Sequence, residues 1–206
     1  MASTRVEAPA GRRADWRTID LMYAAVLGVT FGVLYWAWSS AYTALNTPLS
    51  NLLGPLIGVL GGPWLIAGVV SGLVVRRPGA ALFAEMLAAA VEALVGNEWG
   101  WATLISGGLQ GVGVELVLAA FLFRRFSWPV AALCGAAAAL CELAYEWHAY
   151  WQGTTTGFKL GYGAFFALSG AVVAGLGGWL LTNALARSGS IDASAAGRAA
   201  ARRDAV

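Results

Sequence analysis

The chain has 206 residues, of which 59% are hydrophobic and only 12% are charged. A soluble domain has about 25% charged residues, so this composition excludes an ordinary soluble protein and indicates a multi-pass protein of the plasma membrane. The formal net charge is only +2, and the excess lies in the tails and short loops. It therefore indicates membrane topology and gives no basic surface for nucleic acid.

Six apolar stretches reach the length of about 20 residues that a transmembrane helix needs. They are expected at about 18–44, 49–75, 79–97, 102–124, 128–150 and 160–187. The second contains Gly61-Gly62-Pro63, which is expected either to kink the span or to split it into two pieces. The sequence therefore predicts an all-α integral membrane protein, with a six-transmembrane-helix bundle over residues 18–187.

Arginines concentrate on one side of the expected bundle. They precede the first span, follow the second and fourth spans as Arg-Arg pairs, and follow the sixth from Arg187 onward. The loops on the opposite side hold one lysine, Lys159, and no arginine. Because short cytoplasmic loops are enriched in Lys and Arg, both termini are expected in the cytoplasm. The cytoplasmic parts are then an N-terminal segment, 1–17, and a disordered or weakly helical tail, 188–206.

The first span carries a stripe of small residues, Ala24, Gly28 and Gly32, spaced four apart. Such a stripe lets another membrane helix approach the backbone closely. That helix belongs either to this protein or to a separate subunit that docks there, and the spacing leaves both alternatives open.

Aromatic residues gather at the outer ends of the expected spans. This outer group consists of Tyr35, Trp36, Trp38, Tyr42, Trp99, Trp101, Tyr145, Trp147, Tyr150 and Trp151. An aromatic belt at the membrane surface is the ordinary explanation, but a belt has two sides. The cytoplasmic ends carry chiefly Trp16 and Trp128. The imbalance favours a pocket lined by some outer aromatics, with Trp36, Trp38 and Tyr145 as the candidate stacking surfaces.

Glutamates lie in or beside the apolar stretches, which contain no Lys or Arg to pair them. They are Glu85, Glu92, Glu98, Glu115, Glu142 and Glu146. An ionisable residue within a span costs several kcal/mol, and by default it marks a function. Carboxylates without basic partners favour a site for a cationic or proton-rich ligand.

Three polar residues, Glu92, Gln110 and Glu142, are expected at similar depth in the outer halves of three different spans. They are expected to converge on one outward-facing cavity and to contact the substrate there. Asn97 ends the third span, and Glu146 follows Glu142 by one helical turn, so both are further candidates.

Glu85 lies seven residues before Glu92 and therefore two turns deeper on the same helix face. This position makes it another candidate for substrate binding. Glu115 lies deep in the fourth span. For Glu85 and Glu115 the alternative is a structural carboxyl that is hydrogen-bonded between helices, and the sequence leaves their protonation states open. Glu98 stands in a loop and is expected to be solvated.

Enzyme signatures are missing from the sequence. It has no H-E-x-x-H, no G-x-S-x-G and no phosphate-binding loop for ATP. The single histidine, His148, has no companion residues with metal-ligand spacing. We therefore expect a transport subunit without a catalytic site, a metal, a cofactor or an ATPase of its own.

A string of residues in the third and fourth spans resembles the signature region of the YkoE family. The string consists of Arg77-Pro78-Gly79-Ala80-Ala81, Glu85, Val91-Glu92, Gly96-Asn97, Gly107, Gln110-Gly111 and Glu115. Members of this family are the substrate-binding membrane subunits (S components) of energy-coupling-factor (ECF) vitamin transporters, specific for thiamine or its hydroxymethylpyrimidine precursor. The six-span layout extends the resemblance to most of the chain.

The resemblance implies a six-helix bundle that captures the vitamin from outside. It also implies a transmembrane coupling subunit and two cytoplasmic ATPases as partners, with the small-residue stripe on the helix that docks the coupling subunit. The residues agree with such a ligand, because a thiazolium cation suits carboxylates and aromatic faces, and a pyrimidine edge suits Glu, Gln or Asn. The choice between thiamine and hydroxymethylpyrimidine, and between a dedicated and a shared ATPase module, stays open.

Two other functions are alternatives to a vitamin-binding subunit. One is a proton- or cation-coupled secondary transporter of a small organic cation, with the glutamates as proton carriers. It predicts an inverted repeat, and residues 18–97 and 102–187 show no convincing one. The other is an interaction or assembly protein, which does not need clustered outer aromatics and carboxylates.

Overall fold

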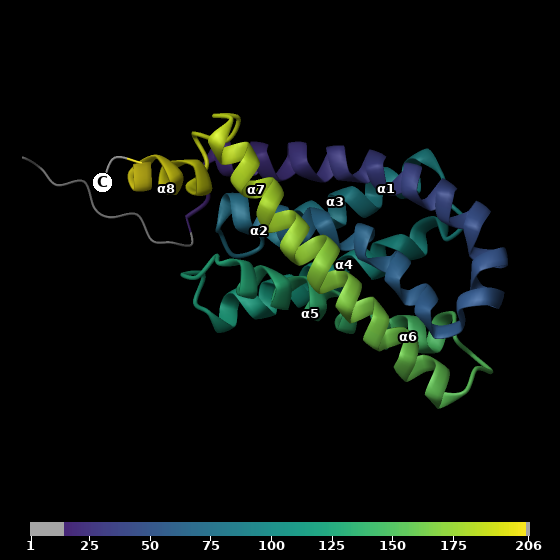
Figure 1. Cartoon of the computed structure of the whole chain (residues 1–206). Coiled ribbons are helices and arrows are strands. Elements are labelled where there is room, and N and C mark those ends of the chain that lie inside the picture. Colours follow the sequence, from purple (N-terminus) through teal and green to yellow (C-terminus); the bar gives the residue numbers. More distant parts are fainter. Residues whose placement is uncertain (1–14, 205–206) are drawn as a thin grey trace, which may run out of the picture.

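The structure is a computed structural model, and it describes residues 15–204. Helices make up its regular elements, and these residues contain no strand (Figure 1). In chain order they are α1 (Thr18–Leu53), the 3₁₀ segment η1 (Gly54–Leu65), α2 (Ile66–Val75), α3 (Ala80–Val95), the 3₁₀ turn η2 (Gly100–Ala102), α4 (Thr103–Ala120), α5 (Trp128–Ala149), α6 (Thr156–Ser169), the π-helical segment η3 (Gly170–Gly177), α7 (Gly178–Arg187) and α8 (Ala195–Asp204). The predicted all-α class is confirmed.

Within residues 15–204, five helical segments are long and apolar enough to cross a membrane. They are Thr18–Asn46, Gly54–Val75, Gly100–Ala120, Trp128–Ala149 and Thr156–Arg187. The third expected span, 79–97, is not among these five. It corresponds to α3, whose 16 residues give a helix of about 24 Å, shorter than a hydrocarbon core of about 30 Å. The residues that α3 buries are alanines and two glutamates. These small side chains let α3 pack against α1 on one side and α4 on the other.

The predicted spans leave residues 44–48 as an outer loop between the first span and the second. This prediction is wrong, because α1 remains helical through Pro48 and ends at Leu53. The chain turns instead at Gly54, whose φ of 52° a residue with a side chain rarely adopts. Pro55 follows immediately, and a Gly-Pro pair is a strong turn signal.

Pro63 changes the helix type of the second span without dividing it. The segment is 3₁₀-helical up to Leu65 and continues directly as α2 from Ile66. Proline has no amide hydrogen, so carbonyl groups one turn earlier lose their donor. Side chains replace it: Ser169 Oγ donates to the Val59 carbonyl at 2.5 Å, and Trp38 Nε1 donates to the Leu60 carbonyl at 3.1 Å.

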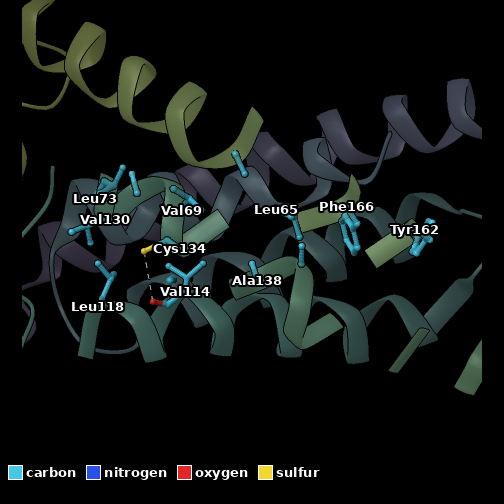
Figure 2. Close-up of a cluster of buried hydrophobic side chains, with 14 of the residues drawn as sticks. Leu65, Val69, Leu73, Val114, Leu118, Val130, Cys134, Ala138, Tyr162 and Phe166 are labelled. Atoms are coloured by element: carbon cyan, nitrogen blue, oxygen red, sulfur yellow. Dashed lines mark hydrogen bonds between the residues drawn. The ribbon is translucent and has the colours of Figure 1, made fainter. Parts of the chain in front are cut away.

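Helix α2 lies at the centre of the molecule, and every residue from Ala67 to Val75 is buried. A helix that is apolar all round is expected in such a place. Figure 2 shows the core that α2 shares with α4, α5 and α6, running from Leu73 and Val130 at one end to Phe166 and Tyr162 at the other. The core thereby fixes the aromatic rings of Tyr162 and Phe166 on α6, in the half of the bundle away from α8.

The C-terminal residues pack onto the same end of the molecule as the start of α1 (Figure 1). The tail 188–206, expected to be disordered or weakly helical, contains α8 and buries Ile191, Ser194 and Ala196. Ser194 caps α8, because its Oγ accepts the amide hydrogen of Gly197 at 3.0 Å. The expectation for the N-terminal segment 1–17 lies, except for its last three residues, outside the described part of the chain.

Candidate functional site

A cavity of about 280 Å³ lies in the half of the bundle away from α8, between α1, η1, α3, α4, α5 and α6. Its acidic and amide lining consists of Asn46, Glu92, Glu98, Gln110, Glu142 and Glu146. Its aromatic lining consists of Tyr35, Tyr42, Trp64, Trp99, Tyr150, Trp151, Tyr162 and Phe166. No Lys or Arg of the described residues lines it. A space of this composition suits a small, flat and positively charged molecule.

Glu92 forms one polar point of the cavity, from the last turn of α3. Its Oε1 accepts hydrogen bonds from Ser39 Oγ and from the Trp64 indole nitrogen, the latter at 3.3 Å. Its other oxygen, Oε2, is buried with no hydrogen-bond partner among the described residues. A buried oxygen without a donor is costly, so this atom is suited to receive a donor or a positive charge from a ligand.

A second polar point joins α4 to α5. Gln110 Nε2 donates to Glu142 Oε2 at 2.5 Å, so the pair presents both an amide and a carboxylate. Glu146 stands one turn further along α5, and its Oε2 is also buried without a partner among the described residues. Two neighbouring carboxylates repel each other when both are ionised, so a proton or a cationic ligand between them is favoured.

Aromatic rings form the walls between these points. Trp64 meets Tyr42 edge-on with ring centroids 5.1 Å apart, and Trp99 with centroids 5.6 Å apart. On the α6 side, Trp151 lies 4.7 Å from Tyr162 between centroids. Because neighbouring rings hold one another in place, their faces are ordered before a ligand arrives.

Four of the predicted substrate-binding residues line the cavity: Glu92, Gln110, Glu142 and Glu146. Asn97 does not. Its Oδ1 accepts the amide hydrogens of Trp99 and Gly100 at 3.1 and 2.6 Å, and its Nδ2 donates to Thr103 Oγ1 at 3.0 Å. Asn97 therefore shapes the turn that carries Trp99 to the cavity, and its contact with substrate stays a prediction.

The three predicted stacking residues do not line the cavity either. Trp38 is turned toward the Leu60 carbonyl, to which it donates. Trp36 is exposed on the outside of α1. Tyr145 packs edge-on against Tyr150, with centroids 5.7 Å apart, and only Tyr150 reaches the cavity. A stacking contact of these three residues with a ligand therefore stays a prediction, and the cavity lining gives it no support. Period and depth do not tell which side of a helix faces the bundle.

Glu85 is buried outside the cavity and joins three helices. It accepts the hydroxyl hydrogen of Tyr35 at 2.8 Å and the amide hydrogen of Gly68, while Tyr35 Oη accepts the amide hydrogen of Ala67 at 2.8 Å. Two unpaired amides in the first turn of α2 are thus satisfied from α1 and α3. Glu85 therefore has a structural role as a hydrogen-bond acceptor between helices. Its contact with substrate stays a prediction, which the cavity lining does not support.

Glu115 acts in the same way at the start of α3. Its Oε1 accepts the amide hydrogen of Ala81 at 2.8 Å and that of Leu82 at 3.4 Å. A carboxylate at a helix N-terminus also interacts favourably with the helix dipole. The structural alternative stated for Glu115 is therefore confirmed.

Several cavity residues were missed from sequence. Glu98 was expected to be solvated, and it is exposed but also lines the cavity. Trp64 and Tyr162 are not among the residues predicted from the sequence. Trp64 is the one aromatic residue in an otherwise small and aliphatic stretch, and that isolation is a signal that points to it. Tyr162 lies among Phe158, Phe165 and Phe166, so the sequence around it gives no such signal.

The small-residue stripe on α1 faces α3. Ala24 is fully buried. A Cβ added to Gly28 would lie 2.9 Å from the Ala84 carbonyl oxygen, and one added to Gly32 would lie 2.7 Å from the Ala88 carbonyl oxygen. The stripe therefore serves internal packing, and the expectation that these three residues dock a separate subunit is corrected.

Replacing Gly28 with leucine should destabilise the protein by about 2 kcal/mol, because the side chain has to displace the α3 backbone. Val29→Leu, on the exposed side of the same helix, is the matched control and should have little effect. Thermal unfolding in detergent measures both. A Gly28→Leu protein of unchanged stability that fails to join a coupling subunit would restore the docking role.

Residues 19–141 match a protein family described as the permease component of an ABC-type cobalt transport system. The putative HMP/thiamine permease protein YkoE of Bacillus subtilis (strain 168) is 30% identical over 186 residues, which cover 89% of this chain and 92% of the relative. The chain belongs to the YkoE family. The resemblance found in the third and fourth spans is thereby confirmed.

A crystal structure of an S-component of an ECF transporter agrees with the fold of this YkoE-family chain. The TM-score is 0.85 at 28% sequence identity, and the match covers 92% of this chain and 95% of the other. The chain is therefore a substrate-binding S component, a multi-pass protein of the plasma membrane. This result favours the S component over the secondary transporter and the assembly protein.

Proposed function

We propose that this YkoE-family protein binds thiamine or its hydroxymethylpyrimidine precursor in the cavity and delivers it to a transmembrane coupling subunit and two cytoplasmic ATPases. The observation that carries the proposal is the lining: carboxylates and aromatic rings without a Lys or Arg among the described residues. The relative's name points to the same ligands. The family description names cobalt, but a wall of indole and phenol rings suits an organic cation.

The two polar points suit the two rings of thiamine. Glu92, whose Oε2 has no partner among the described residues, lines the cavity together with Trp64 and Trp99, so a thiazolium there has both a counter-charge and aromatic faces. The Gln110–Glu142 pair offers one donor group and one acceptor group, which complements an aminopyrimidine edge. At about 280 Å³ the cavity is near the lower end of small-molecule sites, roughly 300–1,000 Å³.

Titration calorimetry on the full chain in detergent tests this proposal. We expect thiamine to bind with a Kd near or below 1 μM, about −8 kcal/mol, and hydroxymethylpyrimidine to bind more weakly because it lacks the cation. Biotin, an anionic vitamin, should not bind. A folded protein that binds neither thiamine nor hydroxymethylpyrimidine would refute the proposal.

We also propose six membrane crossings with both termini cytoplasmic, with the short helix α3 as the third crossing in chain order. The arginine distribution supports this orientation. In a Cys134→Ala/Cys141→Ala background, an impermeant maleimide should label exposed Glu98→Cys in intact cells. It should label exposed Arg125→Cys only after the cells are permeabilised. The reverse pattern would overturn the orientation.

The YkoE-family chain is proposed to lack catalytic activity and to depend on its partners for energy. Its sequence has no phosphate-binding loop for ATP. The carboxylates that line the cavity are accordingly assigned to binding.

A further inference from the structure

Helix α8 packs against α2 and α7 at the end of the molecule where α1 begins (Figure 1). The elements at this end carry Arg17 just before α1, Arg76 at the end of α2, and Arg202 and Arg203 in the last turn of α8. Asp20 is the acidic partner of Arg77, whose Nε lies 3.3 Å from its Oδ2, and of Arg17 in a shorter ion pair. No other ion pair is found among the described residues. The remaining arginines at this end therefore have no carboxylate partner in residues 15–204.

Arg76 is the most constrained of these. It ends α2 in the left-handed conformation, with φ of 57°. Its Nε donates to the Leu73 carbonyl at 3.0 Å, and its guanidinium carbon lies 4.5 Å from the centre of the Phe126 ring. The guanidinium is thus held in a fixed place by packing, without an opposite charge to compensate it.

Helix α8 packs against α2, the helix that Arg76 ends, and carries Arg202 and Arg203 in its last turn. Burial, with a smaller contribution from the like charges of Arg203 and Arg202, lowers the pKa of Arg76 to about 10. Three like charges in one region repel each other, and an anion bound between them removes that electrostatic repulsion.

The position of α8 is built into the fold. Ile191 and Ala196 are buried in the same apolar cluster as Val74 and Val75 of α2. The Ala193 carbonyl also accepts a hydrogen bond from Arg17 at 3.4 Å. The C-terminal arginines are therefore carried by a packed element.

We propose that Arg76, Arg202 and Arg203 form a binding site for the phosphate group of an anionic lipid headgroup. Guanidinium groups bind phosphate through paired hydrogen bonds. Arg76 directly follows the membrane segment Gly54–Val75, so the site lies at headgroup depth. With the proposed topology, on which this inference rests, the leaflet is the cytoplasmic one, whose anionic lipids attract basic juxtamembrane segments.

The test uses the full chain in a neutral detergent, without thiamine. Dioleoyl-phosphatidylglycerol, dioleoyl-phosphatidylcholine and inorganic phosphate are titrated separately, and binding is measured by native mass spectrometry and by the shift in Tm. The variant is Arg202→Gln/Arg203→Gln. Arg124→Gln/Arg125→Gln, which removes the same charge from an exposed turn after α4, is the control.

We expect phosphatidylglycerol to bind and to raise the Tm of the wild type and the control equally. The affinity of the α8 variant should fall about thirtyfold, since each arginine contributes about 1 kcal/mol near anionic lipid. Equal weakening in both variants would mean a general charge effect and overturn the site. A Tm shift with inorganic phosphate equal to that with phosphatidylglycerol, or equal binding of phosphatidylcholine, would overturn the lipid assignment. Because thiamine is absent, failure of the cavity proposal leaves these results unaffected.

Discussion

Replacing Glu92 with glutamine should weaken thiamine binding about thirtyfold or more, which is about 2 kcal/mol, because charged hydrogen bonds dominate in a dry site. The change keeps the shape of the side chain. Its remaining carbonyl oxygen still accepts from Ser39 and Trp64, as Oε1 does now. What is lost is the charge on the buried oxygen that has no partner among the described residues.

Glu98→Gln is the matched control for this experiment. Glu98 lines the same cavity but is exposed, so water screens its charge and its removal should cost little. Calorimetry with hydroxymethylpyrimidine adds a second comparison. If Glu92 pairs with the thiazolium, Glu92→Gln should affect thiamine much more than hydroxymethylpyrimidine. Unchanged thiamine affinity in a folded Glu92→Gln protein would remove Glu92 from the site.

Replacing Glu85 with leucine should lower the free energy of unfolding by about 3 kcal/mol, since two buried donors then lose their acceptor at about 1–3 kcal/mol each. Those donors are the Tyr35 hydroxyl and the Gly68 amide, which joins the first turn of α2 to α3. Because α2 is the centre of the core, the loss should reach the whole bundle.

Glu85→Gln is the control for this change, because it keeps an acceptor oxygen and should cost clearly less. Denaturant or thermal unfolding in detergent measures both proteins. Thiamine affinity of the folded Glu85→Leu protein should stay close to that of the wild type, since Glu85 does not line the cavity. A stable Glu85→Leu protein that no longer binds thiamine would assign Glu85 to the ligand.

The sequence is informative about the membrane spans and about the glutamates as a set, because both follow from the cost of placing polar groups in lipid. It does not separate ligand-binding glutamates from structural ones. Glu92 and Glu85 lie on the same face of α3, two turns apart, yet only Glu92 reaches the cavity. The difference arises because Glu85 meets the start of α2, where backbone amides need an acceptor.

The periodicity of the sequence also does not determine which helices contact one another. The Ala24, Gly28 and Gly32 stripe shows that a helix packs closely there, and only the structure identifies that helix as α3. Trp38 lies at the right depth for the cavity, but it is directed to the Leu60 carbonyl. That hydrogen bond depends on Pro63, which lies on a different span.

Mass spectrometry can identify the small molecule that copurifies with the full chain from a thiamine-producing host, and so tests whether the cavity binds thiamine or its precursor. We expect thiamine or hydroxymethylpyrimidine in up to one equivalent, with thiamine reduced in Glu92→Gln and retained in Glu98→Gln. A different small molecule at one equivalent, retained equally by both variants, would contradict it.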